Sequence, residues 1–311
     1  MIDHPFGTFW LALAISAILG WPMLILMRKV KGHASISQYT PEHAGKTGTP
    51  SMGGIAPAIA IVAVLLWLSV SYPRSDGVYL AMLIGIAGYG ALGLADDFLI
   101  PRLMPGKRGF GWTQKLVAQV LITAAIVVSL SPSTAFEAVV TGFLVLFFAN
   151  AINFSDGLDG LCGGLLILAL LAFTRSSLGP AAMAIIGALI PFMFLNAPPA
   201  KIFMGDVGAL PLGAVYGLFV AHELFNPGQV PQWLLAVSLI IVSLIFILEL
   251  ALVPIQLFWV KVFKKRLIPA SPVHHSFEKM GWPETRITSI FILTQLLLTI
   301  LGISLVNGMW L

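Results

Sequence analysis

Long apolar runs separated by polar loops constrain this chain more than any other feature of its sequence. Ten of them fall near 6–27, 55–71, 77–95, 114–130, 135–149, 158–174, 180–195, 207–221, 233–259 and 286–306. An α-helix needs roughly 20 apolar residues to cross the hydrocarbon core of a bilayer. A lone segment in lipid satisfies its own backbone polar groups only as a helix. The pattern therefore predicts an all-α, polytopic integral membrane protein with about ten transmembrane helices.

The ninth run differs from the others in its length. Residues 233–259 exceed one untilted span, and Pro254 interrupts them. A proline inside a helix removes a backbone hydrogen bond and kinks the chain. We therefore expect the ninth helix to be broken or kinked near Pro254. No internal repeat stands out, so residues 1–311 are predicted to form a single transmembrane domain.

Composition excludes several other classes of protein. Charged residues make up 10% of the chain and hydrophobic residues 58%, whereas a typical soluble domain is roughly 25% charged. The net charge of +4 is too small for a nucleic-acid binder of this length. The single cysteine, Cys162, excludes a disulfide framework within one chain. We therefore expect the protein to interact with the lipid bilayer and not with nucleic acid.

The loops between the runs alternate in character. One set is short, and the other is longer and charged, at 28–54, 96–113, 150–157, 196–206 and 260–285. Of the 17 Lys and Arg residues, all but Arg74 and Arg175 fall on the side of the charged loops. The positive-inside rule makes that side cytoplasmic. Both termini are then expected outside, because the number of spans is even.

Five aspartates follow odd-numbered spans, which all end on the predicted cytoplasmic face. Asp96 and Asp97 follow the third span, Asp156 and Asp159 follow the fifth, and Asp206 follows the seventh. One such Asp is readily explained as a helix cap, but five on one face indicate a site. Mg²⁺ is usually held by one or two carboxylates together with substrate phosphates. The cluster therefore predicts a Mg²⁺ site that faces an anionic substrate.

Other polar residues of the same face fit phosphate chemistry. Five cationic side chains on this face could pair with phosphate oxygens, or they could serve only to set the orientation of the protein in the membrane. They are Lys46, Lys107, Arg108, Lys115 and Lys201. The segment from Gly48 to Gly54, which contains Ser51, has the glycines and hydroxyls that can cradle phosphate ahead of a helix. The adjacent His274 and His275 could bind phosphate, transfer protons or ligate a metal, and we expect both to be catalytic residues. Glu249 lies within the ninth span, where a carboxylate is a functional candidate by default.

Five motifs occur in order on these loops. They are Gly48-Thr-Pro-Ser-Met-Gly-Gly54, Asp96-Asp97, Asn153-Phe-Ser-Asp-Gly-Leu-Asp-Gly160, Asn196-Ala-Pro-Pro-Ala-Lys-Ile-Phe-Met-Gly-Asp206 and Pro272-Val-His-His-Ser-Phe-Glu278, the last followed by Gly281-Trp-Pro-Glu284. Together they resemble the polyprenyl-phosphate N-acetylhexosamine-1-phosphate transferases. The His-His loop makes the chain most similar to the phospho-N-acetylmuramoyl-pentapeptide transferase (translocase I) branch of bacterial cell-wall synthesis.

This resemblance implies a ten-helix enzyme of the bacterial inner membrane, usually a homodimer, with a cytoplasmic Mg²⁺ site. It implies transfer of phospho-MurNAc-pentapeptide from UDP-MurNAc-pentapeptide to undecaprenyl phosphate, which gives lipid I and UMP. Asp206 corresponds to the metal ligand, and Asp96 and Asp97 correspond to the catalytic pair. The matched positions on the substrate side are Lys46, Asn196, Phe203 and Asp159 in the uridine-side pocket, Asn153 and Asp156 beside it, and His274 and His275 near the sugar phosphate.

The chain departs from the family pattern at four positions. Ile100 stands where the family has Lys, Ser276 where it has a third His, and Val207 and Ala209 where it has Thr and Ser. A related transferase that uses another UDP-sugar, such as UDP-GlcNAc, is therefore an alternative. An ion-coupled transporter is an alternative of a different class, but it would place ionisable groups near the bilayer midplane, where we expect only Glu249.

Overall fold

The computed structural model describes residues 5–30, 46, 48–72, 77–104, 106–107 and 109–306. Most of the predicted loop 28–54, Arg108 and both chain ends lie outside the described residues. Every element of the described chain is a helix: α1 (Pro5–Val30), α2 (Ile55–Ser71), α3 (Val78–Leu94), the π-helix η2 (Ala95–Leu99), α4 (Ile100–Leu103), α5 (Trp112–Leu130), α6 (Ala135–Phe154), α7 (Leu161–Leu170), the 3₁₀-helix η3 (Leu171–Phe173), α8 (Gly179–Asn196), α9 (Asp206–Phe225), α10 (Gln232–Val242), α11 (Leu244–Phe263), α12 (Val273–Lys279) and α13 (Glu284–Val306).

The helices confirm the prediction of a polytopic membrane protein. In the described chain, 8 helices are long and apolar enough to cross a membrane, and α2, α7 with η3, and α10 are shorter apolar helices. Each predicted apolar run coincides with one helix or with two successive helices. The hydropathy of the sequence therefore gives the order of the helices along the chain.

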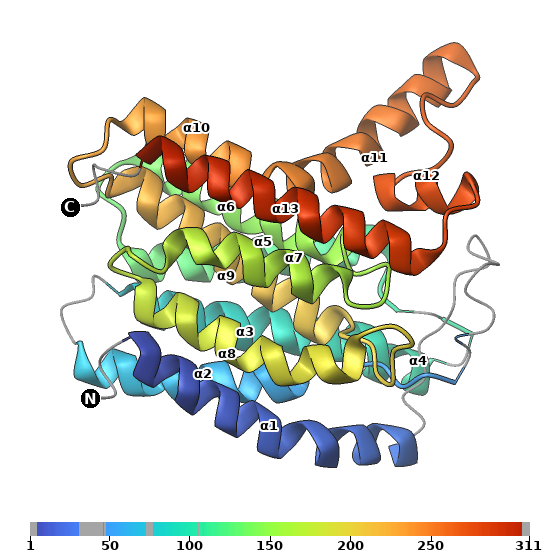
Figure 1. The fold of residues 1–311 in the computed structure, drawn as a ribbon, viewed down its shortest axis with the longest axis horizontal. Helices are drawn as coiled ribbons and strands as arrows, with labels where there is room; N and C mark the ends of the chain where they lie inside the picture. Colours follow the sequence, from blue (N-terminus) through green and yellow to red (C-terminus); the bar gives the residue numbers. More distant parts are fainter. Residues whose placement is uncertain are drawn as a thin grey trace.

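The main helices lie side by side and alternate in direction, so their connections gather at two opposite ends of the bundle (Figure 1). The beginning of α1 and the end of α13 lie at one end, whereas α4 and α12 lie at the other (Figure 1). We call the end that carries α4 and α12 the loop end. The loops with the predicted aspartates all belong to it.

Helix α9 occupies the centre of the bundle. In an apolar stretch of 18 residues of α9, 89% of the stretch is buried inside the protein, against 17% of the corresponding stretch of α5 at the periphery. Tyr216 of α9 packs against Phe148 of α6, Phe173 of η3 and Phe246 of α11, with ring centroids 5.0, 5.7 and 5.5 Å apart. Because α9 begins at Asp206, the most enclosed helix of the protein delivers that carboxylate to the loop end.

The ninth span is interrupted at a different residue from the one expected. The break lies at Ser243, between α10 and α11, and Pro254 lies inside α11. Ser243 has φ −92° and ψ 1°, and its hydroxyl pairs with that of Tyr216 at 2.9 Å. This buried polar pair marks the break, whereas α11 continues past its proline, as membrane helices commonly do.

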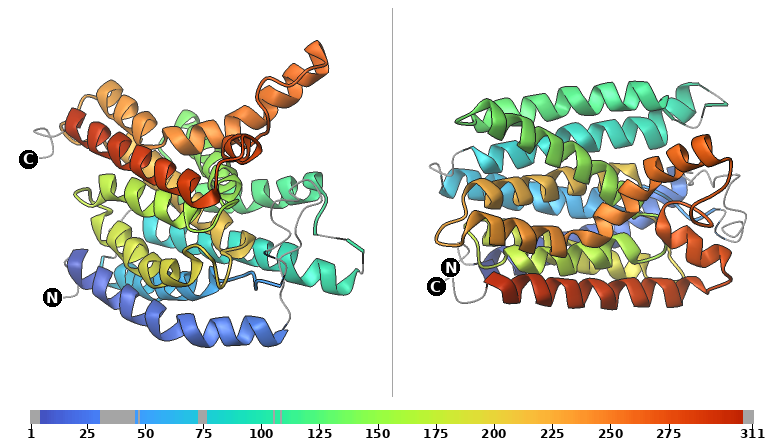
Figure 2. Two further views of the ribbon diagram at one scale, coloured as in Figure 1. Left: turned by 45° about the vertical axis from the view of Figure 1, so that its right-hand side comes forward. Right: turned by 90° about the horizontal axis from the view of Figure 1, so that it is seen from above.

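Helix α11 diverges from the other helices and extends beyond them at the loop end (Figure 2). The chain then returns through residues 264–272 to the short helix α12, which lies between α11 and the start of α13 (Figure 1). Gln256 of α11 fixes this return. Its amide accepts from the backbone N–H groups of Leu267 and Ile268 and donates to the carbonyl of Ile268 at 2.9 Å.

Candidate active site

Asp96 and Asp97 lie on the π-helix η2, where α3 reaches the loop end. Single π-helical turns are rare and often occur at functional sites. Asp97 Oδ2 accepts from the backbone N–H of Asp206 at 2.9 Å, and Asp96 Oδ1 accepts from that of Phe110 at 2.6 Å. The adjacent carboxylates therefore face different elements, one toward α9 and one toward the segment before α5.

Lys115 connects two of the carboxylates. Its ammonium group pairs with Asp96 Oδ2 at 2.8 Å and with Asp206 Oδ2. Asn153, near the end of α6, donates to Asp206 Oδ1 at 2.7 Å. We call Asp96, Asp97, Lys115, Asn153 and Asp206 the Asp206 cluster. It draws on η2, α5, α6 and α9, so the structure brings together five predicted residues from elements that are separate in sequence.

Gly205 shapes the approach to Asp206. It has φ 73° and ψ 169°, a region of backbone conformation that is essentially restricted to glycine. A Cβ atom at this position would lie 2.7 Å from both Asp97 Oδ2 and Ser51 Oγ. Ser51 therefore lies beside the cluster.

The backbone N–H groups of Gly53 and Gly54, in the segment that could cradle phosphate, form hydrogen bonds within the protein. The N–H groups of Gly53 and Gly54 donate to the carbonyls of Phe203 and Met204 at 2.8 and 3.0 Å. The N–H of Phe203 in turn donates to the carbonyl of Pro50 at 2.9 Å. These bonds join two loops, so the N–H groups of Gly53 and Gly54 are paired within the protein.

Lys46 forms a second group of charges. Its ammonium lies 2.6 Å from Asp159 Oδ1, 2.5 Å from Glu284 Oε1 and 5.8 Å from the centre of the Phe203 ring. Glu284 also accepts from the N–H of Asp159 at 2.6 Å, and Asp159 Oδ2 accepts from the N–H of Ala200 at 2.9 Å. We call Lys46, Asp159, Phe203 and Glu284 the Lys46 cluster. Sequence reasoning gave no role to Glu284, although it closes a motif on the same face.

Asn196 holds the loop between these clusters together. Its Oδ1 accepts from the N–H of Gly160 at 3.1 Å, and its Nδ2 donates to the carbonyl of Ile202 at 2.9 Å. The side chain is buried. In this structure Asn196 thus braces the backbone around the predicted pocket.

Asp156 lies between the two clusters, and its Oδ2 accepts from the N–H of Gly205 at 3.2 Å. Burial, and then the negative charge of Asp206, raise the pKa of the Asp156 carboxyl well above its usual range. The Asp156 carboxyl therefore holds a proton more readily than an exposed aspartate does.

The two predicted histidines have different environments on α12. The His274 side chain is fully buried and its Nδ1 pairs with Glu249 Oε2 at 2.9 Å. The His275 side chain is 20% exposed and its Nδ1 lies 2.5 Å from Glu278 Oε2. Ser276, where the family has a third His, holds the loop through Ala270, accepting from its N–H at 3.0 Å and donating to its carbonyl at 2.5 Å.

The Asp206 cluster fits a hard divalent cation by the chemistry of its oxygens. Within the described residues no three acidic, His or Cys side chains form a ready-made metal site, and the Lys115 ammonium stands between Asp96 and Asp206. Magnesium does not need such a site, because one or two carboxylates together with substrate phosphates usually hold it. Asp206, Asp96 and Asp97 supply suitable oxygens.

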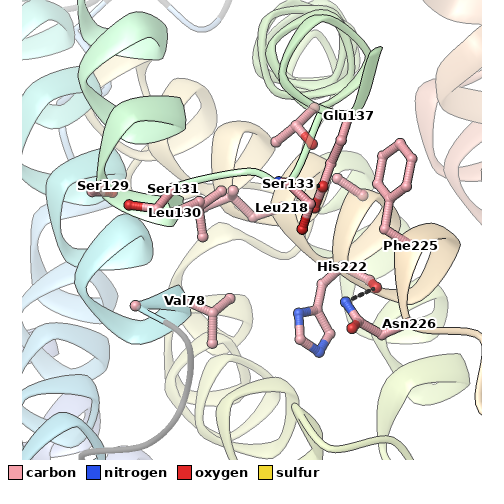
Figure 3. A pocket seen from close by; sticks show the side chains of 13 residues that line it. Val78, Ser129, Leu130, Ser131, Ser133, Glu137, Leu218, His222, Phe225 and Asn226 are labelled. Carbon is pink, nitrogen blue, oxygen red and sulfur yellow. Dashed lines mark hydrogen bonds between the residues drawn. The ribbon is translucent and has the colours of Figure 1, made fainter. Parts of the chain in front are cut away.

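Two cavities help to locate the site. One of about 630 Å³ opens at the loop end beside Asp96 and is lined by Lys107, Phe110 and Gln114. Another of about 520 Å³ lies at the opposite end of the bundle, where Glu137 of α6 and His222 of α9 line it (Figure 3). Asp206 is the first residue of α9 and Phe225 at that second cavity is the last, so about 30 Å of helix separates them. The cavity beside Asp96 is the one next to the converging carboxylates.

Comparison with known proteins identifies relatives of this chain. Residues 79–222, which include all five residues of the Asp206 cluster, match the family described as glycosyl transferase family 4. The chain is 34% identical over 319 residues to the phospho-N-acetylmuramoyl-pentapeptide-transferase of Geobacillus kaustophilus, covering 93% of this chain and 94% of that one. It is 34% identical over 290 residues to the Lactobacillus acidophilus protein of that name, covering 85% of each chain. Identity to the Bacillus subtilis protein of that name is 31% over 321 residues, or 95% and 96% of the two chains.

Proposed function

The chain belongs to the phospho-N-acetylmuramoyl-pentapeptide transferase family of membrane enzymes, and from this premise we propose that it makes lipid I. In this proposal, phospho-MurNAc-pentapeptide passes from UDP-MurNAc-pentapeptide to undecaprenyl phosphate, and UMP is released. The observation that carries the proposal is the convergence of Asp96, Lys115, Asn153 and Asp206 from four separate elements.

In the proposed reaction, a phosphate oxygen of the lipid carrier attacks the phosphorus that is attached to the sugar. The bond from that phosphorus to the bridging oxygen breaks, and UMP leaves with this oxygen. The second pKa of a phosphate monoester is near ~6, so most of the nucleophile is already dianionic at neutral pH. Positioning and charge neutralisation, rather than a strong base, therefore supply most of the rate.

The residues of the Asp206 cluster take complementary roles in this proposal. The Lys115 ammonium is placed to pair with phosphate oxygens, and Asn153 and Lys115 orient the Asp206 carboxylate. Asp206, together with oxygens of Asp96 or Asp97, would hold Mg²⁺, and the ion would neutralise part of the pyrophosphate charge. Asp96 is the residue placed to accept any remaining proton.

A single displacement is favoured over a two-step route through an aspartyl phosphate on Asp97. One Asp97 oxygen accepts the N–H of Asp206 at 2.9 Å, which suits a carboxylate that organises the start of α9. Incubation with radiolabelled nucleotide substrate and no lipid acceptor distinguishes the routes. We expect no label on the protein, and a phospho-sugar trapped on Asp97 would establish the two-step route.

The lipid carrier is proposed to approach along α11. The side chains of Leu257 and Phe258 on this diverging helix are 67% and 65% exposed, and they offer an apolar surface to a polyprenyl chain. A photoreactive undecaprenyl phosphate analogue should crosslink to α11. Crosslinks confined to α1 or α2 would contradict this path.

For the whole molecule, we propose one transmembrane domain in the bacterial inner membrane, with the loop end in the cytoplasm and both termini outside. We also propose a homodimer, which size-exclusion chromatography with light scattering in detergent tests directly. A monomer at micromolar concentration would remove that part of the proposal.

The nature of the sugar is tested by one assay. Purified protein, Mg²⁺ and undecaprenyl phosphate are offered UDP-MurNAc-pentapeptide and UDP-GlcNAc separately, and UMP is measured. We expect release with the first nucleotide. Release with only the second would reassign the substrate, and release with neither would contradict the proposed function.

A further inference from the structure

Glu249 and His274 form a buried pair that the reaction described above does not use. Glu249 lies on α11 and His274 on α12, and neither side chain is exposed to solvent. Glu249 Oε2 accepts from the backbone N–H of Val273 at 3.1 Å and lies 2.9 Å from His274 Nδ1. A buried carboxylate with two such partners fixes both the start of α12 and the plane of the imidazole.

The opposite edge of the imidazole lies against the loop that follows α6. His274 Nε2 is buried and has no hydrogen-bond partner within the described structure. A Cβ atom at Gly157 would come far inside van der Waals contact with Nε2, and other ring atoms are also close. His274 therefore packs directly on the backbone of Gly157, where only a glycine leaves room for it.

Gly157 belongs to the loop that joins the two clusters of the site. On one side of it, Asp156 accepts from Gly205 N–H, next to Asp206, at 3.2 Å. On the other side, Asp159 pairs with Lys46 at 2.6 Å and accepts from Ala200 N–H at 2.9 Å. A shift of Gly157 therefore changes the spacing between the Asp206 cluster and the Lys46 cluster.

We propose that Glu249 is a positioning residue for the transfer reaction and that it acts through His274 on the Asp156–Asp159 loop. The proposal rests on the proposed function and gives His274 a role different from the catalytic one expected from sequence. The His274 ring packs against Gly157 and so supports the Asp156–Asp159 loop. The partly exposed His275 is the histidine placed to contact substrate.

The first test compares variants that keep or remove each hydrogen bond. Glu249→Gln retains an oxygen that accepts from Val273 N–H and His274 Nδ1, whereas Glu249→Leu retains none. His274→Asn keeps a donor near the Nδ1 position but lacks the ring edge that contacts Gly157. We expect Glu249→Gln to keep most UMP release. Glu249→Leu and His274→Asn should lose roughly tenfold to a hundredfold in kcat/KM for the nucleotide substrate, because the loop loses the side chain that holds it in place.

The matched control is Gln295→Leu. Gln295 is also a fully buried polar side chain, and it donates to the carbonyl of Val242 at 2.8 Å, away from the loop. We expect Gln295→Leu to lower thermal stability as Glu249→Leu does, with unchanged kcat/KM for the nucleotide substrate. Equal kcat/KM values in these two variants, or a folded His274→Asn variant with the wild-type kcat/KM, would overturn the positioning role.

The second test does not depend on activity. Gly157→Ala should lower the unfolding temperature in detergent, because its methyl group meets His274. In a His274→Asn background the same change should cost clearly less, since the ring edge is absent. Equal losses in both backgrounds would contradict the contact. If the wild-type protein releases no UMP, the proposed function fails, while this cycle still decides whether the contact exists.

Discussion

At the scale of single residues, each carboxylate of the site has a distinct set of partners. Asp206 contacts Lys115 and Asn153 through its side chain, while its own N–H is held by Asp97. Asp96 contacts Lys115 and the N–H of Phe110. The five aspartates are therefore a set of differently oriented oxygens, and Lys115 offsets part of their mutual repulsion.

Gly205→Ala tests how strictly this orientation matters. The backbone at 205 is restricted to glycine, and a Cβ would meet Asp97 and Ser51, so we expect UMP release to fall roughly tenfold or more. The matched control is Gly228→Ala, which also has a positive φ, 59°, but has nothing within 4 Å of the added Cβ. Equal activity of the two variants would show that the position of Asp206 is not critical.

At the scale of elements, the ends and interruptions of helices create the site. The π-helix η2 carries the Asp pair, α9 begins at Asp206, and α6 ends just after Asn153. The interruption at Ser243 separates α10 from α11, and α11 then leaves the bundle (Figure 2). Regular helices thus provide the scaffold, and their irregular ends provide the chemistry.

The Tyr216–Ser243 pair should stabilise the break between α10 and α11. Hydrogen bonds between membrane helices contribute about 0.6 kcal/mol on average, so Ser243→Ala and Tyr216→Phe should each lower unfolding free energy by about that amount. The double variant should cost little more than one single variant, as measured by reversible unfolding in detergent micelles. Fully additive losses would mean that the two hydroxyls do not interact in the folded protein.

Hydropathy predicts the helices because it depends only on local composition. It also predicts that the five aspartates lie at one end of the bundle, because they all follow odd-numbered spans. The partners within the site depend on how helices pack. Sequence does not show that Lys115 bridges Asp96 and Asp206, or that Glu284 joins Lys46. Pro254 is the visible signal for a helix break in the sequence, whereas the break lies at Ser243, whose hydroxyl pairs with that of Tyr216 on another helix.

At the scale of the whole molecule, the bundle has two chemically different ends. The loop end carries both charged clusters, and the opposite end carries the beginning of α1 and the end of α13 (Figure 1). A transporter would place its ionisable groups near mid-membrane. Here the clustered charges lie at helix ends, and Glu249 is enclosed with His274, an arrangement suited to an enzyme that works at a membrane surface.

The proposed orientation is tested by cysteine labelling. The only native cysteine, Cys162, is buried, so the wild-type protein serves as the unlabelled control. Asn226→Cys, at the end of the bundle opposite the loop end, should react with a membrane-impermeant maleimide in cells whose outer membrane alone is permeabilised. Lys201→Cys should react only after the inner membrane is opened. The reverse pattern would invert the topology and move the site outside.

The central claim is that transfer takes place at the Asp206 cluster with Mg²⁺, and Asp206→Asn tests it most directly. Asparagine has nearly the same shape but no charge, so the fold should persist while Mg²⁺-dependent UMP release from UDP-MurNAc-pentapeptide falls roughly 100-fold or more. The measurement is UMP formed by purified variant and wild-type protein across a Mg²⁺ titration, with thermal unfolding as the check on folding. A folded Asp206→Asn variant that retains near-normal Mg²⁺-dependent activity would contradict the account.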